Sequence, residues 1–238
     1  MKLKKNIQIF LIVSSYLFSV NVFADSNLSL SAKLLSSNWE GSNRDSATDY
    51  DTTEGGQLGF NIAYQNGRFY TGLNFQGGDY KFDGNAPDQI TLLGRQSFTD
   101  TTVEHAQFDL IFGYYFWERI SLFIDLKSVE NKWQNTNQKQ NYSGIGFGGS
   151  GIWPINSNWS IYGSVGFVPA GKVEANNVEV GDGVSSAFEV GGIYNITQNN
   201  RLSFGAKFQT LNYEFDSGDE QENTMNGLFV GYSYIFKI

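Results

Sequence analysis

The sequence predicts an all-β protein, a transmembrane antiparallel up-and-down β-barrel of about ten strands that follows a cleaved signal peptide. Three observations predict this fold. The first 24 residues have the pattern of an export signal, and the rest of the chain alternates apolar and polar residues from end to end. The connections between these runs are alternately short and long along the chain, as in barrels whose two rims face different compartments.

The export signal occupies residues 1–24. Three lysines within the first five residues precede an apolar run from Ile7 to Val20, and Ala24 supplies a small residue for cleavage. The run is too short and too polar for a membrane-spanning helix, which needs about 20 apolar residues, although a retained anchor helix is the alternative. Cleavage after Ala24 leaves residues 25–238 as a single barrel domain.

Composition excludes several function classes. The chain has no cysteine, which excludes a disulfide scaffold, a thiol nucleophile and a cysteine zinc site. Its 24 acidic and 16 basic residues argue against a nucleic-acid partner, which requires a basic face. We expect no cofactor, since the Gly-rich run 144–149 lacks the Lys-Ser/Thr pair of a phosphate-binding loop and no helical pattern follows it.

Each expected strand is a run with a period of two residues. In chain order the runs cover residues 28–34, 58–64, 69–75, 106–114, 120–126, 142–153, 159–167, 188–194, 202–208 and 228–238. Asn66-Gly67 between the second and third runs predicts a tight hairpin. Glycines blur the phase of the run 142–153, so eight strands are the alternative to ten.

The connections differ in length in a regular way. The short ones cover 65–68, 117–119, 154–158 and 196–200, and the long ones cover 40–56, 77–101, 130–141, 171–183 and 216–223. Outer-membrane barrels have short periplasmic turns and long extracellular loops. Ten strands that start in the periplasm place every long connection outside the cell and return the C-terminus to the periplasm.

The two faces of the strands indicate a lipid environment. One face carries Leu, Ile, Val and Phe, while the other carries Gly, Ser, Asn, Gln and scattered charges, which would make a poor soluble core. Tryptophans stand by the short turns (Trp117, Trp153, Trp159) and at the opposite ends (Trp39, Trp133), as in the aromatic belts at membrane interfaces. A soluble β-sandwich is the alternative.

This pattern resembles small Gram-negative outer-membrane β-barrels of the OmpA and opacity-protein type, in the porin-like superfamily. Within the final strand, Gly231, Tyr234, Phe236 and Ile238 look like the C-terminal signal that the barrel-assembly machinery reads, although such strands usually end on Phe or Trp. The resemblance implies a monomer in the bacterial outer membrane, in contact with its lipid and lipopolysaccharide, that periplasmic chaperones deliver. It implies no particular activity.

Charged residues in the inward phase are candidate lumen residues. They are three bases and three acids: Lys33, Asp109, Asp125, Lys127, Glu189 and Lys207. A charge on the lipid face costs about 2–4 kcal/mol for Lys at mid-bilayer, so we expect these side chains to point inward and to pair. The expected interior is polar and hydrogen-bonded with little or no open channel. The alternative is a thin water-filled pathway with weak ion selectivity.

The long connections hold 17 of the 24 acidic residues, which predicts an acidic extracellular surface. We interpret it as a solvated, self-repelling surface; the alternative is divalent-cation binding that bridges to lipopolysaccharide phosphates. We expect no metal site, since no calcium-loop pattern is present.

His105 is the only histidine, so catalysis is a remote alternative. Omptin proteases share the expected strand count but use an Asp-Asp and an Asp-His pair. Asp49 and Asp51 would imitate the first pair, whereas Glu104 and His105 alternate faces of one strand and cannot form the second. We therefore predict a non-enzymatic scaffold that presents acidic loops, chiefly 77–101 and 134–140, for surface interaction or envelope integrity. The alternatives are a narrow porin-like passive channel and, remotely, a hydrolase with a site at His105.

Overall fold

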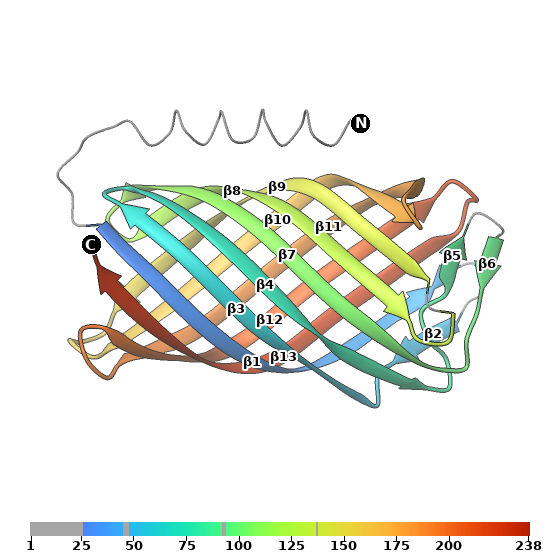
Figure 1. Ribbon diagram of the computed structural model, residues 1–238, viewed down its shortest axis with the longest axis horizontal. Helices are drawn as coiled ribbons and strands as arrows, with labels where there is room; N and C mark the ends of the chain where they lie inside the picture. Colours follow the sequence, from blue (N-terminus) through green and yellow to red (C-terminus); the bar gives the residue numbers. More distant parts are fainter. Residues whose placement is uncertain (1–25, 45–47, 92–93, 137) are drawn as a thin grey trace.

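The computed structural model describes residues 26–44, 48–91, 94–136 and 138–238 as a closed antiparallel β-barrel (Figure 1). The predicted signal peptide lies outside the described residues. No helix in the described part of the chain is long and apolar enough to cross a membrane.

Ten strands form the barrel wall, and each pairs with its neighbours along the chain. They are β1 (Ser26–Asn43), β3 (Glu54–Asn66), β4 (Phe69–Asp83), β7 (Asp100–Trp117), β8 (Ile120–Trp133), β9 (Lys139–Pro154), β10 (Trp159–Ala175), β11 (Val178–Asn195), β12 (Asn200–Phe215) and β13 (Glu220–Lys237). The barrel closes where β13 pairs with β1, from Asn27 opposite Lys237 to Asn43 opposite Gln221. The prediction of ten strands is confirmed, including β9 in the uncertain Gly-rich region.

Three further strands lie at one rim. β2 (Thr48–Asp51) extends the edge of β1, while β5 (Gln89–Thr91) and β6 (Gly94–Gln96) form a small hairpin between β4 and β7. Figure 1 shows this rim at the end opposite to the start of β1 and the C-terminus.

The short turns gather at the rim that holds the start of β1 and the C-terminus (Figure 1). Gly67 has a φ of 58° in the tight turn that Asn66-Gly67 predicted. Trp117, Trp153 and Trp159 stand on the outer surface near these turns, as expected of an interfacial belt. The two longest segments between barrel strands, 44–53 and 84–99, both lie at the other rim, so by the rule that long connections are extracellular this rim faces the periplasm and the other rim faces outside.

Most of the predicted long extracellular loops are in fact strands. Only 134–138, 176–177 and 216–219 connect β8 to β9, β10 to β11 and β12 to β13. Asn176 and Asn177, with φ of 49° and 68°, make a two-residue hairpin turn, because Asn tolerates the left-handed conformation that such turns need. The prediction of long loops at 130–141, 171–183 and 216–223 was therefore wrong.

The error has a physical cause, which is a change of face along each strand. In β8, Leu122 and Ile124 point to the outer surface, whereas Val129 and Trp133 further along are buried inside the barrel. Glu130 and Lys132 point outward between them. Beyond the membrane, the apolar face becomes the inner one and the outer face becomes polar, so the alternation changes phase although the strand continues.

The second predicted aromatic belt was also wrong. Trp39 and Trp133 each have 1% of their surface exposed and lie inside the barrel, while Trp117 is 64% exposed. Trp39 is six residues beyond Lys33 in β1, so both side chains share the inward phase. The interior near the outer rim is consequently aromatic rather than polar.

Candidate functional site: the barrel lumen

The inside of the barrel is the candidate site, and its lining changes from one rim to the other. An aromatic layer fills the outer part, a layer of paired charges lies in the middle, and an open vestibule faces the periplasm. Strand phase builds all three layers, because every second residue of each barrel strand points inward.

Trp39 stands at the centre of the aromatic layer. Its ring makes edge-on contacts with Tyr80, Phe82 and His105 at centroid distances of 5.3, 5.6 and 5.8 Å. Its Nε1 donates a hydrogen bond of 3.1 Å to Asn223 Oδ1, which satisfies the polar end of the indole. Other members of the layer are Val103, Val129, Trp133, Tyr142, Val173, Leu211, Tyr213, Phe215 and Met225.

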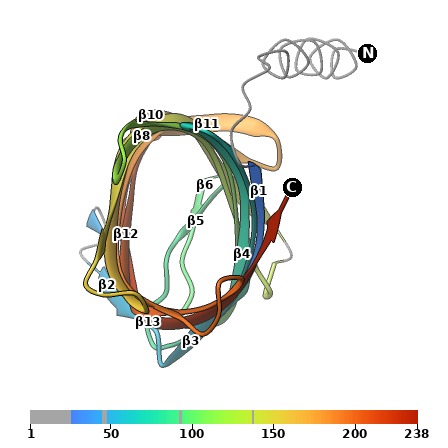
Figure 2. The ribbon, with the colours of Figure 1, turned by 90° about the vertical axis from the view of Figure 1, so that its left-hand side faces the viewer.

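The segment between β4 and β7 closes the outer end, and we call residues 84–91 together with 94–99 the lid. Figure 2, which looks in from the other rim, shows β5 and β6 within the outline of the ring. Trp133 Nε1 donates to Pro87 O at 3.0 Å, and Asn43 Nδ2 donates to Ala86 O at 3.2 Å. Gln221 Nε2 donates to Asp88 O at 3.0 Å. The expectation that the whole of 77–101 reaches outward was wrong, because residues 86–90 are buried in the mouth of the barrel, while 94–97 are exposed and a role in recognition stays a prediction.

Ion pairs fasten the lid and the rim. Arg95 of the lid lies 3.6 Å from Asp88 and 3.1 Å from Asp219, which is in the turn between β12 and β13. Arg44, just after β1, pairs with Glu220 and Glu222 of β13. Several acidic residues of the outer rim are therefore paired with Arg44 or Arg95 and link neighbouring segments of the rim. Among the described residues, no group of three or more acidic or histidine side chains is placed to hold a metal ion.

β2 covers the aromatic layer from the side through Tyr50. Its phenol is buried and donates to Glu222 O at 2.8 Å. Burial raises the pKa of Tyr50 well above its ordinary value, since a phenolate there would lose its hydration.

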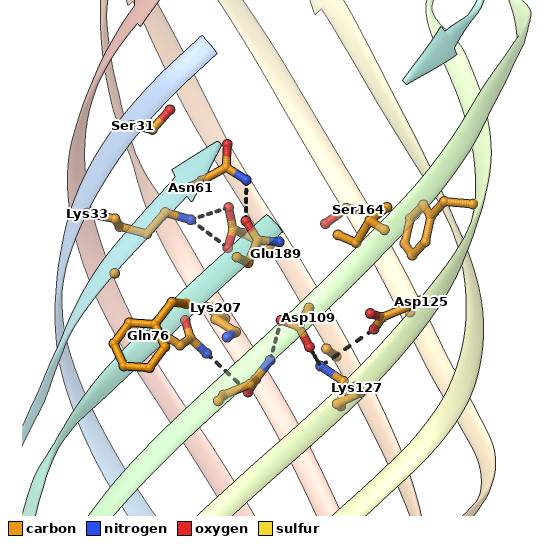
Figure 3. Close-up of a pocket in the computed structure, with 18 of the residues that line it drawn as sticks. Ser31, Lys33, Asn61, Gln76, Asp109, Asp125, Lys127, Ser164, Glu189 and Lys207 are labelled. Carbon is orange, nitrogen blue, oxygen red and sulfur yellow. Dashed lines mark hydrogen bonds and ion pairs between the residues drawn. The ribbon is translucent and has the colours of Figure 1, made fainter. Parts of the chain in front are cut away.

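All six candidate lumen residues line one cavity of about 380 Å³ in the middle of the barrel (Figure 3). Lys33 Nζ reaches across to Glu189 at 2.7 Å and lies 4.1 Å from the centre of the Phe229 ring. Tyr162 Oη donates to the same Glu189 at 2.7 Å. These contacts join β1 to β10 and β11 across the lumen.

A second group of charges lies on neighbouring strands. Lys127 Nζ is 2.5 Å from Asp109 and 3.6 Å from Asp125, and Gln107 Nε2 donates to Asp109 at 2.7 Å. Lys207 makes no ion pair with the described residues but shares the cavity with Asp109. Five of the six charges are thus paired. With Lys207 the middle layer has three bases and three acids, so its net formal charge is close to zero.

Sequence reasoning did not identify the vestibule at the periplasmic rim. It has a volume of about 720 Å³, and Tyr70, Tyr115, Arg201 and Lys237 are among its lining residues. The inward phase of β7 contains Asp109 and Tyr115 alike, so phase alone was sufficient to place Tyr115 in the lumen.

His105 lies in the aromatic layer, where its ring contacts Trp39 and Tyr80. It is 2% exposed, and its Nδ1 is 2.7 Å from Asn131 Oδ1. The preceding Glu104 points outward and pairs with Lys132 at 3.3 Å. No described carboxylate forms an ion pair with His105, so the elements of an Asp-His pair do not meet here.

Three residues of the proposed assembly signal lie on the last strand, β13, and Ile238 directly follows it. Tyr234 and Phe236 face outward, and the terminal Ile238 is also exposed. Gly231 faces the lumen, where a Cβ would come 2.6 Å from Ser203 Oγ. The three outward positions fit contact with lipid, and the signal itself stays a prediction.

Comparison with known proteins identifies the architecture. No family model and no curated protein matches the chain. Among solved structures, the outer membrane protease OmpT from Escherichia coli superposes with a TM-score of 0.55 at 10% identity, over 92% of this chain and 99% of that chain. An outer membrane channel from Pseudomonas putida F1 gives 0.45 at 11% identity, over 91% of this chain and 97% of that chain.

A third barrel, Neisserial surface protein A, gives a TM-score of 0.38 at 9% identity, over 87% of this chain and 96% of that chain. At these identities the likeness to OmpT extends to the fold alone. The chain therefore has the fold of a bacterial outer-membrane β-barrel, and its apolar outer surface fits that location.

Proposed function

We propose that this outer-membrane barrel is a non-enzymatic, closed scaffold that presents a rigid acidic rim outside the cell, for surface interaction or envelope integrity. The observation that carries the proposal is the sealed outer end. An aromatic core and a lid that is hydrogen-bonded to β1, β8 and β13 leave no wide outer mouth for solute entry.

The rim is well suited to presentation because it is stiff. In the described part of the rim, strands such as β10 and β11 stay paired up to tight turns such as Asn176-Asn177, which restrains the backbone. A rigid surface loses little conformational entropy on binding, which favours affinity. We propose that it works as a monomer among lipopolysaccharide, after insertion by the barrel-assembly machinery with the help of periplasmic chaperones.

The absence of catalysis is part of the proposal. A general base must reach its substrate within hydrogen-bonding distance, whereas His105 lies under Trp39 and Tyr80. We expect the purified wild-type protein to show no protease or lipase activity. Such an activity in the wild type, lost in His105→Gln, would favour a hydrolase.

A narrow passive channel is the second candidate, and the middle cavity favours it. Six charged side chains line that cavity, and charged linings set ion selectivity in pores. Conduction would require the lid and the aromatic layer to move.

Two sets of variants distinguish the scaffold from the channel in cells that produce the protein. The rim variants Asp49→Lys and Asp216→Lys change exposed acidic residues of the outer surface and leave the lid in place. The lumen variant Asp125→Asn leaves that surface intact. For a scaffold, leakage of a dye that intact outer membranes exclude changes with the rim variants and not with Asp125→Asn. The reverse pattern would overturn the scaffold.

A further inference from the structure

The periplasmic vestibule has the size of a small-molecule site. Its volume of about 720 Å³ falls within the roughly 300–1,000 Å³ that is typical of ligand pockets. Inward residues at the periplasmic ends of the strands and residues of the short turns line it. The proposed scaffold role gives the vestibule no function, so its role is unassigned.

The charge of the vestibule is unbalanced. Arg201 and Lys237 line it, and the described residues of its lining include no acidic side chain. Arg201 makes no ion pair with the described residues, and its Nε is buried with no hydrogen-bond partner. A buried guanidinium donor without an acceptor is costly. This contrasts with the middle layer, where Lys33 and Lys127 both have carboxylate partners.

Two tyrosines face Arg201 from the opposite wall. Its strand, β12, is separated from β7 by four barrel strands in either direction, yet Arg201 and Tyr115 of β7 line the same vestibule. The rings of Tyr115 and Tyr70 lie 5.3 Å apart, and the Tyr70 hydroxyl is 3.0 Å from Ser121 Oγ. Gly113 makes room for this pair, because a Cβ there would come 2.1 Å from the Tyr70 ring.

We propose that the vestibule binds a small organic acid that enters from the periplasm. Its carboxylate would take the free guanidinium hydrogen bonds of Arg201, since the planar guanidinium matches a carboxylate in bidentate geometry. Its apolar body would lie against the Tyr70–Tyr115 pair, and Lys237 would add attraction at the rim. The site does not depend on whether the lumen conducts.

Calorimetric titration of the purified mature protein in detergent micelles tests the site. The probes are benzoate, its neutral analogue benzamide and inorganic phosphate. We expect benzoate to bind at millimolar concentration or below. Benzamide, which lacks the charge, and phosphate, which lacks an apolar body, should each bind at least about tenfold more weakly.

Variants assign the binding to Arg201. Arg201→Gln should weaken benzoate binding at least about tenfold, and Arg201→Lys should also weaken it because a lysine has no planar fork. Tyr115→Leu should weaken it several-fold. The matched control is Arg119→Gln, which removes one exposed charge from a short turn at the same rim but outside the vestibule lining. Heat-dependent gel mobility verifies that each variant is folded.

Four results would overturn the proposal. They are no benzoate binding to the wild type at about 10 mM, which is weaker than ordinary ligand recognition; equal affinity for benzamide; unchanged affinity in folded Arg201→Gln and Arg201→Lys; or an equal loss in Arg119→Gln. An equal loss in Arg119→Gln would show that the affinity for benzoate depends only on the net charge of the rim.

Discussion

The two halves of this barrel bury their apolar side chains on opposite faces. In the membrane half, residues such as Leu122 and Ile124 of β8 point to lipid and the lumen holds polar and charged groups. In the outer half, Val129 and Trp133 of the same strand point inward, and the outer surface is polar. One continuous strand therefore satisfies two solvents, hydrocarbon and water, by exchanging the roles of its faces.

This difference explains why the outer end is closed. A barrel wall in water must cover its apolar face, and the only place to do so is inside. Trp39, Tyr80 and Phe82 accordingly pack as in a soluble protein core, with the lid over them. The membrane half has no such requirement, so its lumen retains cavities and ion pairs.

The largest expected effect comes from the centre of the aromatic layer. Trp39→Ala should lower the free energy of unfolding by about 3–5 kcal/mol, because it opens a cavity in a packed core. Urea denaturation in detergent micelles measures this. The control Trp117→Ala removes an equally large ring from the outer surface. If both variants lose the same amount, the outer half does not pack as a core.

The second-largest effect is expected from the buried ion pairs of the middle layer, which should contribute more to stability than ion pairs on the outer surface. Lys127→Met leaves Asp109 and Asp125 without their shared partner, so we expect a loss of about 3 kcal/mol, at the low end for a broken buried ion pair because the cavity can admit water. Lys139→Met breaks the exposed pair with Glu130 and should cost no more than about 1 kcal/mol. The same unfolding assay applies, and equal losses would mean that the lumen pair is as well hydrated as the surface pair.

Tyr50 gives the outer half a characteristic response to alkaline pH. Since the folded-state pKa of Tyr50 is raised, its contribution to stability is fully present below its unfolded pKa of about 10 and is lost as the pH rises through the folded pKa. Tyr50→Phe should cost about 1 kcal/mol at pH 7, through the lost hydrogen bond to Glu222 O. The difference from wild type should shrink above pH 10, whereas a constant difference would indicate a hydrated phenol.

The smallest effect is expected on the outer surface. Lys172 and Glu179 form an exposed ion pair beside the Asn176-Asn177 turn. Lys172→Ala should leave the unfolding midpoint within experimental error, because water and salt screen such pairs. A clear loss that disappears in high salt would show that surface charges contribute to the stability of the outer half.

The sequence was sufficient for the fold and for the charged layer. Alternation gave the strands, Asn66-Gly67 gave a turn, and inward phase placed Lys33 and Asp125 in the lumen. It was not sufficient for the outer half, where the change of apolar face between Ile124 and Val129 of β8 imitates the end of a strand. The lid depends on hydrogen bonds between groups far apart in the chain, for which local patterns carry no signal.

The most direct test of a lumen closed at its outer end is the electrical conductance of the wild-type protein in a planar lipid bilayer. Flotation of proteoliposomes establishes insertion, and a variant with Asn-Gly in place of 84–99 serves as the comparison, since Asp83 and Asp100 remain paired at its new turn. We expect no steady single-channel openings from the inserted wild type. Reproducible openings with a selectivity that Asp125→Asn shifts would contradict the closed scaffold.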